Sequence, residues 1–403
     1  MFCEQIKNIN NKMSKWESNE EIQFFREYLR IDSSHPNIDY KPCVAFLEKQ
    51  ASNLNLSFAV HYPSNIDNPV CVMTWTGSQP NLPSILLNSH MDVVPVFADK
   101  WTHPPLAAEI DESGKIYARG SQDMKCVGMQ YLAAIRALKR DGIQQLKRTI
   151  YLTFVADEEL GGVHGMRPFV ESAIFKSMNV GIALDEGIAS PTEVFNVYYG
   201  ERTVWEIEFR CNGQSGHGSM LLKNTPGEKV NSLMNKFMEF RCTQVELLES
   251  NPDLSIGDVT TVNVTILSGG VQGNVVPPVL NFVVDIRVAN SMKQWCEKAG
   301  GEIEMHFRKK EPKAPLTPID QTNPFWVAFK GITDELNLKI KTLIFPGGTD
   351  SRFVRRANIP ALGFSPMNHT PILLHDHDEY HQADIYLNGI EIYKKIIPAL
   401  ANV

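Results

Sequence analysis

Histidine and carboxylate side chains recur directly after apolar runs of this chain. His90 and Asp92 follow "SILLNS", Glu158 and Glu159 follow "YLTFVAD", and Glu186 follows "GIALD". Ligands of open α/β sheets bind outside the carboxyl ends of the strands, which is where these side chains would lie. Imidazole and carboxylate groups without thiolates are typical of a hydrolytic zinc or manganese site and not of a structural, cysteine-rich one.

Each cluster taken alone has a simpler explanation. Asp123, in "RGSQDMK", could cap the helix that follows it, and a single His-x-Asp is a weak motif. The histidine-rich "LLHDHDEYH", which contains His375, His377 and His381, could be a solvated turn. The combination favours a metal site, because several buried carboxylates close to one another are costly unless cations neutralise them.

The adjacent residues Glu158 and Glu159 could have two different roles. Neighbouring side chains of an extended backbone point in opposite directions, so one glutamate could bind metal while the other faces the substrate. A catalytic base must be a carboxylate that is close to the metal without being captured by it.

Two kinds of segment must position these groups. The first kind is an α/β pattern in which mostly apolar strands alternate with helices. Its strands are expected at residues 69–77, 84–90, 148–156, 179–186, 338–345 and 359–366, and its helices at residues 17–31, after Pro42 and over residues 123–142.

The second kind of segment lies between these parts and has a half-exposed pattern. Residues 203–211 alternate apolar and polar side chains, and the capping box of Thr225 and Glu228 begins a helix to about residue 249. Strands at 258–267 and 279–288, a helix near 291–309 and a proline-broken linker at 309–320 follow. We therefore expect a catalytic domain of residues 1–198 and 314–403 with an inserted two-layer α+β domain of residues 199–313.

Composition bounds the class of protein. The 403 residues exceed one typical core, and the net charge of −7 argues against a surface that binds nucleic acid. No apolar run approaches the roughly 18 residues of a membrane span. The seven scattered cysteines form no C-x-x-C pair and the polar start has no apolar centre, so we expect free thiols, no secretory signal and a cytoplasmic protein, with Met13 as an alternative start.

The ordered motifs "SHMDVVP", "ARGSQDMK", "VADEELGG", "LDEG", "GQSGHGS", "GGTDSR" and "LHDHDE" resemble the aminoacylase and carboxypeptidase-G family of di-zinc metallopeptidases. The similarity runs from about residue 20 onward, and "IALDEGIASP", "EPKAPLTPID" and "LLHDHDE" resemble its aminoacylase branch. The resemblance implies a zinc-exopeptidase-like catalytic domain, in which helices flank a mixed sheet, and an inserted dimerisation or lid domain. It also implies hydrolysis of N-acyl-L-amino acids to a carboxylate and a free L-amino acid.

The same resemblance assigns the metal centre. One zinc would be held by His90, Asp123 and Glu186, and the other by Asp123, Glu159 and His375, with Asp123 and a water or hydroxide as bridges. His375 is preferred to His377 because the ligand histidine of the family precedes a glutamate by four positions, as His375 precedes Glu379. Asp92 would orient the His90 ring, and Glu158 would be the general base. A cis peptide bond is expected between Asp123 and Met124.

Residues of the inserted domain and of "GGTDSR" would bind the substrate. The resemblance implies a homodimer in which His217 reaches the active site of the partner subunit and polarises the scissile carbonyl. Asn274 and Arg287 would bind the carboxylate and carbonyl of the substrate, and Thr349, with Gly347 and Gly348, would shape the carboxylate end of the pocket. A flexible glycine turn around His217 and a local ion pair between Arg287 and Asp285 are the structural alternatives.

Two other functions stay open at this point. A dipeptidase of the same family would use the same motifs, which do not separate an acyl group from an aminoacyl group. A non-catalytic protein that binds metal or amino acids is the alternative from another class, and Glu158 argues against it because a binding protein needs no free base.

Overall fold

The computed structural model describes residues 16–288 and 303–403, which form two compact units. The large unit comprises Met1–Gly200, Pro315–Thr342 and Thr349–Val403, and the small unit comprises Glu201–Ala314 and Leu343–Gly348. The domain boundaries expected after residues 198 and 313 lie within two residues of the main boundaries of these units. The short segment Leu343–Gly348, which the sequence assigned to the catalytic domain, is grouped with the small unit.

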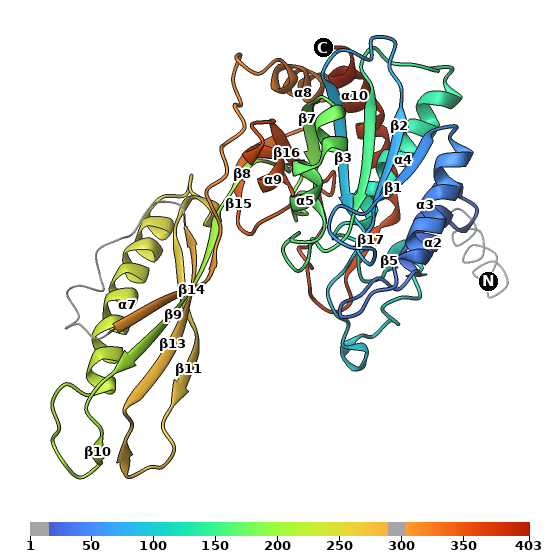
Figure 1. Cartoon of the computed structure of the whole chain (residues 1–403). Helices are drawn as coiled ribbons and strands as arrows, with labels where there is room; N and C mark the ends of the chain where they lie inside the picture. The colour runs from blue at the N-terminus through green and yellow to red at the C-terminus, as the bar shows by residue number, and fades with distance from the viewer. Residues whose placement is uncertain (1–15, 289–302) are drawn as a thin grey trace. The chain divides into compact units, whose positions relative to one another are not determined.

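An eight-stranded mixed sheet is the centre of the large unit (Figure 1). Its strand order is β1-β2-β6-β3-β7-β16-β8-β15. The strands β6, β3, β7 and β16 pair in parallel, whereas β1, β2 and β8 join by antiparallel pairing. The bounds are β1 Ser57–His61, β2 Val70–Trp75, β3 Ser84–His90, β6 Ile150–Val155, β7 Val180–Asp185, β8 Phe195–Glu201, β15 Ile340–Phe345 and β16 Ala361–Phe364.

Helices cover both faces of this sheet because its strands are apolar on both sides. Ile85 and Leu87 of β3 pack into the larger hydrophobic cluster, and Leu86 between them packs into a second cluster. The larger cluster includes α2 (Glu20–Leu29), α3 (Lys41–Asn53), α4 (Lys125–Arg140), α8 (Pro324–Glu335) and α10 (Ala383–Ala401). The second cluster includes α5 (Met166–Glu171), α6 (Ala173–Ser177) and α9 (Ser351–Arg356).

A small three-stranded sheet of the large unit links distant parts of the chain. It has the order β17-β5-β4, with β4 at Glu109–Ile110, β5 at Lys115–Tyr117 and β17 at Tyr380–Gln382. Its antiparallel pairing of β17 with β5 holds residues near the C-terminus beside the segment that precedes Asp123.

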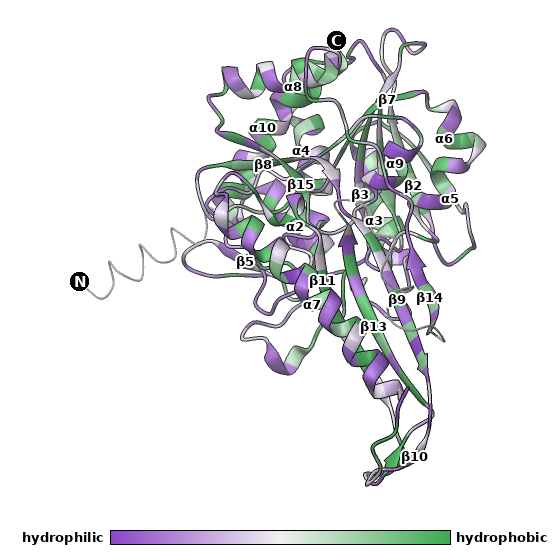
Figure 2. Cartoon of the chain, turned by 90° about the vertical axis from the view of Figure 1, so that its left-hand side faces the viewer, coloured by the Kyte–Doolittle hydropathy of each residue, from purple (hydrophilic) through white to green (hydrophobic). Residues whose placement is uncertain are grey.

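The small unit is a two-layer structure with one helix on a four-stranded antiparallel sheet. Its strand order is β11-β13-β9-β14, and α7 (Pro226–Ser250) begins at the predicted capping box of Thr225 and Glu228. Ile207, Phe209 and Cys211 of β9 face the apolar layer under α7, and Figure 2 shows the resulting bands of hydrophobic and hydrophilic residues. The other bounds are β9 Thr203–Asn212, β10 Gly216–His217, β11 Thr261–Gly269, β12 Val275–Val276, β13 Val279–Val288 and β14 Ile303–Lys310.

The helix predicted near residues 291–309 is wrong over its described part, because residues 303–310 form strand β14. Apolar and polar side chains alternate in "IEMHFRKK", which is the period of a strand, and β14 pairs with β9. The rest of that prediction, at residues 289–302, and Met13 lie outside the described residues. In the part of the chain that the structure describes, no helix has the length and apolarity to span a membrane.

Candidate metal centre

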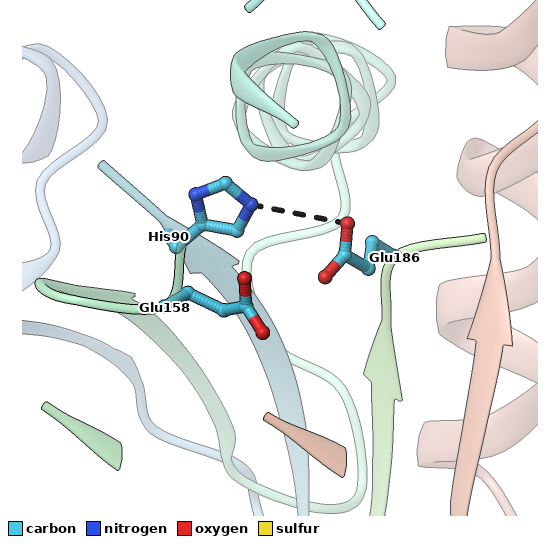
Figure 3. Close-up of side chains that lie close together, drawn as sticks. All are labelled: His90, Glu158 and Glu186. Carbon is cyan, nitrogen blue, oxygen red and sulfur yellow. Dashed lines mark ion pairs between the residues drawn. The ribbon is translucent and has the colours of Figure 1, made fainter. Parts of the chain in front are cut away.

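Three neighbouring parallel strands bring their carboxyl ends together at the predicted site. His90 is the last residue of β3 and lies in register with Val155, the last residue of β6. Glu158 follows β6, and Glu186 follows β7 on the other side of β3. Figure 3 shows the three side chains converging, with Nε2 of His90 lying 3.8 Å from Oε2 of Glu186.

Loop residues complete this cluster. Asp123, which precedes α4, places Oδ1 3.0 Å from Nε2 of His90 and Oδ2 3.3 Å from Nε2 of His375. Nε2 of His375 also lies 3.1 Å from Oε2 of Glu159. The Asp123 carboxylate thus faces two imidazoles with its two oxygens, which is the arrangement that a bridging ligand needs.

The five residues predicted as ligands therefore come together, and Glu158 lies among them. Potential ligand atoms within 4.8 Å of one another form two groups, one of His90, Glu158 and Glu186 and one of His90, Asp123 and Glu159. The sequence had placed Glu158 beside the metals as a base, whereas this geometry also leaves it within reach of a ligand position.

The electrostatics of the cluster are those of excess buried negative charge. Burial raises the pKa of Glu158 and of Glu186 well above the usual range, and it also raises the pKa of Glu159. Burial acts in the same direction on Asp123, but hydrogen bonds with His375 and His90 outweigh it and lower the pKa of that carboxyl. Hydrogen bonds with Asp123 and Glu159 raise the pKa of His375 to about 10.

These side chains fit a pair of divalent cations. Imidazole nitrogens lie 3.0–3.3 Å from the carboxylate oxygens of Asp123 and Glu159, and divalent cations held between these groups would neutralise the carboxylates. Oε1 of Glu159 is buried and has no hydrogen-bond partner among the described residues, so it is free to bind a metal. The nitrogen and oxygen donors suit zinc, and the five ligands come from five separate segments of the large unit.

Asp92 acts through different atoms than the sequence suggested. Nδ1 of His90 donates to the backbone carbonyl of Asp92 at 2.8 Å, whereas the nearest carboxylate oxygen of Asp92 is 3.7 Å away. That carboxylate accepts the backbone N–H groups of Glu158 and Glu159 at 3.2 and 3.0 Å. Asp92 therefore orients the ring with its main chain and holds the Glu158–Glu159 turn with its side chain.

His35 is a partner of Asp92 that sequence reasoning missed. Its Nε2 lies 2.9 Å from Oδ2 of Asp92. A single histidine 57 positions earlier in the chain carries no sequence signal for this contact. It completes the hydrogen bonding of a carboxylate that is fully buried.

The motif "GGTDSR" contributes residues other than those predicted from it. Arg352 places Nη1 3.6 Å from Oε1 of Glu158 and donates to the backbone carbonyls of Thr349 at 2.6 Å and Gly161 at 2.7 Å. Asp350 is buried beside Asp185, and burial raises its pKa to about 8. Sequence reasoning missed both Arg352 and Asp350, although the quoted motif contains them.

The predicted substrate-binding residues of this motif are less directly tied to the cluster. Thr349 is buried at the start of α9, where its Oγ1 accepts the backbone N–H of Ser351 at 3.3 Å. Gly347 and Gly348 belong to the small unit by their contacts. Their role at the carboxylate end of a pocket stays a prediction.

Two of the predicted site residues, His217 and Asn274, lie in the small unit. His217 lies in β10 opposite Val275 of β12, and the N–H of Gly218 donates to the carbonyl of Asn274 at 2.7 Å. The exposed imidazole of His217 is within hydrogen-bond distance of Ser219, with 2.8 Å between Nδ1 and Oγ. His217 and Asn274 are thus neighbours in this unit, and their roles toward the metal centre stay predictions.

Arg287 forms the local ion pair with Asp285 that the sequence suggested as the alternative to substrate binding. Its Nε and Nη2 donate to the two carboxylate oxygens of Asp285 at 2.8 and 3.1 Å. The guanidinium is about one-third exposed, so the pair leaves part of it accessible. A role in binding substrate stays a prediction.

The expected cis peptide bond between Asp123 and Met124 is absent. Among the described residues the one cis bond joins His35 and Pro36. Trans is the lower-energy form of a bond that does not precede proline, and Met124 meets the start of α4 with φ −122° and ψ 28°.

Comparison with known proteins identifies the family to which the chain is similar. The model of peptidase family M20/M25/M40 matches residues 86–399. Aminoacylase-1 from Homo sapiens is 44% identical over 398 residues, which cover 96% of this chain and 97% of that protein.

Solved structures agree on the fold. An M20 family metallo-carboxypeptidase from Sulfolobus solfataricus superposes with a TM-score of 0.72 at 17% identity over 95% of this chain and 99% of that one. A dinuclear metal-binding peptidase of the M20 family from Bacillus subtilis gives a TM-score of 0.65 at 14% identity over 94% and 96% of the two chains.

Proposed function

Because the chain belongs to peptidase family M20/M25/M40, we propose that it is a metal-dependent amidohydrolase that cleaves N-acyl-L-amino acids to a carboxylate and a free L-amino acid. The observation that carries this proposal is the 44% identity with human aminoacylase-1 over almost the full length of both chains. The convergence of two imidazoles and four carboxylates at the ends of β3, β6 and β7 supports it independently.

The ligand set supports two zinc ions per subunit. One would be held by His90, Asp123 and Glu186, and the other by Asp123, Glu159 and His375, with Asp123 shared. When bound, such a pair of cations lowers the pKa of a water molecule and polarises the amide carbonyl of the substrate.

Glu158 would move the protons of this reaction. Its carboxylate accepts a proton from the attacking water and delivers that proton to the amide nitrogen, which leaves as the amine of the free amino acid. The Asp92 carboxylate fixes the backbone of Glu158, and the Arg352 guanidinium lies beside Oε1. These contacts restrain Glu158 and support its assignment as a base.

The small unit would supply the remaining groups across a homodimer. In this proposal His217 stabilises the negative charge that develops on the carbonyl oxygen in the active site of the partner subunit. Asn274, Arg287 and Thr349 bind the substrate's polar groups, and partial exposure of Arg287 beside Asp285 leaves N–H donors for a carboxylate. The five described cysteines form no disulfide, which supports a reducing, cytoplasmic location.

A dipeptidase is the second candidate function. The carnosine dipeptidase 1 fold is shared, with a TM-score of 0.64 at 15% identity, and the described ligands suit either reaction. Assaying N-acetyl-L-methionine against a dipeptide such as glycyl-methionine separates the two, because we expect the acylated amino acid to give the larger kcat/KM. A larger value for the dipeptide would replace the aminoacylase assignment.

The catalytic role of Glu158 gives the direct test of mechanism. Glu158→Gln keeps size and burial but removes the proton acceptor, so turnover should fall by about 10²–10⁴-fold while bound zinc is retained. Glu193→Gln, at an exposed glutamate, is the matched control and should keep wild-type turnover. Near-normal turnover of Glu158→Gln would remove Glu158 from this role.

A further inference from the structure

Glu379 is a fully buried carboxylate next to the metal centre that none of the ligand groups contains. Among the described residues, its hydrogen-bond donors all belong to the short segment 119–123, which ends at Asp123. They are Arg119 Nη1 at 2.7 Å, Gly120 N at 3.2 Å, Ser121 Oγ at 3.4 Å, Gln122 N at 2.6 Å and Asp123 N at 3.4 Å. The carboxylate thus organises the backbone that presents Asp123.

Gln122 joins the same two segments from the opposite direction. Its Nε2 donates to the carbonyls of Pro371 and Tyr380 at 3.1 and 2.9 Å, and its Oε1 accepts the N–H of Leu373 at 3.1 Å. These bonds fasten both ends of the segment 371–380, which carries His375, to the segment that carries Asp123. We call Glu379 and Gln122 the loop clamp.

The second metal position has particular need of such a clamp. Two of the three ligands of the first position, His90 and Glu186, lie at or directly after strands of the central sheet. In the second position, His375 and the shared ligand Asp123 both lie in loops. His375 has a positive φ of 61° and a side chain that is 55% exposed, so its own packing gives it little restraint. The charge-assisted hydrogen bond from Arg119 Nη1 to Glu379 Oε2, at 2.7 Å, provides a buried attachment.

We propose that the loop clamp sets the distance between Asp123 and His375 and thereby determines the affinity of the second metal position. Glu379 and Gln122 are positioning residues in this scheme and touch neither metal nor substrate. The inference rests on the proposed two-metal function, and it adds that the two positions depend unequally on the same pair of residues. The first position keeps His90 and Glu186 when the clamp is broken.

The test is a titration of metal-free protein with Zn²⁺ in the wild type and in two variants. Glu379→Gln removes the charge that organises segment 119–123, and Gln122→Leu removes the three side-chain bonds to segment 371–380 while preserving volume. Outer partners of metal ligands are worth about 10–100-fold in affinity, so one of two bound ions should weaken by that factor. The other ion shares Asp123 but keeps His90 and Glu186, so its affinity should fall by a smaller factor.

Two controls separate positioning from folding. Thr102→Val loosens the same loop from outside, because Thr102 Oγ1 donates to Asp378 Oδ2 at 2.6 Å, and it should leave both affinities unchanged. Thermal unfolding of the metal-free proteins shows whether each variant is folded. If Glu379→Gln is not folded because Arg119 has lost its counter-charge, the Gln122→Leu titration decides the question.

The outcomes are distinguishable from a failure of the proposed function. Wild-type protein that binds fewer than two ions would contradict the two-metal site itself. Wild-type protein that binds two ions, together with folded variants that bind both as tightly or weaken both equally, would overturn the role of the loop clamp.

Discussion

His381 should make the protein sensitive to acid, although it lies outside the metal centre. Its ring is fully buried against Phe25 and Tyr386, with centroid distances of 6.3 and 5.6 Å. Nδ1 lies 3.2 Å from the carbonyl of Gln382 and donates to it, while Nε2 has no hydrogen-bond partner within the described chain. A second proton would therefore enter at a buried atom without an acceptor.

The magnitude follows from the depressed pKa of this imidazole. Burial lowers the pKa of His381 from 6.5 to about 4. The folded protein therefore binds this proton more weakly than the unfolded protein does. The stability that neutral His381 contributes is fully present above about pH 6.5 and is lost as the pH falls toward 4. The loss amounts to about 2 kcal/mol at about pH 5 and about 3 kcal/mol below about pH 4.

The perturbation that removes this loss is His381→Phe. A phenyl ring keeps the contacts with Phe25 and Tyr386 and loses the bond to Gln382, at a cost of about 1 kcal/mol at neutral pH. Urea unfolding gives the free energy of unfolding of the metal-free wild type and variant at each pH. Between about pH 7.5 and about pH 5, the difference between the two free energies should shift by about 2 kcal/mol in favour of the variant.

His306→Gln, at an exposed histidine of the small unit, is the matched control for loss of an imidazole. If the free energies of unfolding of wild type and His381→Phe differ by the same amount at both pH values, this reasoning is refuted. That result would mean that the folded protein binds a proton at His381 as readily as the unfolded protein does.

Two further predictions concern the active site. His90→Ala should remove one bound zinc, whereas Asp92→Asn, which disturbs the backbone of Glu158 and Glu159, should weaken zinc binding by about 10–100-fold and lower turnover. Zinc analysis after dialysis and steady-state kinetics measure these effects. Equal zinc loss in both variants would contradict the role given to Asp92. Mixing inactive His217→Ala and Glu158→Ala proteins and allowing subunits to exchange should restore activity if His217 acts across a dimer, and a mixture as inactive as its components would place His217 outside the partner's site.

Local sequence signals were enough where neighbouring residues in the chain decide the structure. The stretch at residues 84–90, with three apolar residues at its centre, predicted β3 with the bounds that the structure has, and the capping box at Thr225 predicted the start of α7. Strand ends followed by acids predicted His90, Glu158 and Glu186 at one edge of the sheet. The helix predicted near residues 291–309 was wrong at β14, although the side chains of "IEMHFRKK" alternate with the period of a strand.

The tertiary structure decided which of several side chains of the same type lies at the metal centre and which lies in the core. Three histidines near the C-terminus have similar sequence surroundings, yet His375 contacts Asp123 and His381 is buried in the core. The partner of the Asp92 carboxylate and the donors to Glu379 were likewise not evident from the sequence.

The sequence by itself therefore determined the family, the layered architecture and the chemical types available at the metal centre, because these depend on composition, periodicity and motif order. Only the tertiary structure decided the hydrogen-bond partners that orient those groups. Glu379 and Gln122 bond to residues about 250 positions away, and such contacts depend on the packing of whole elements, which no local pattern encodes.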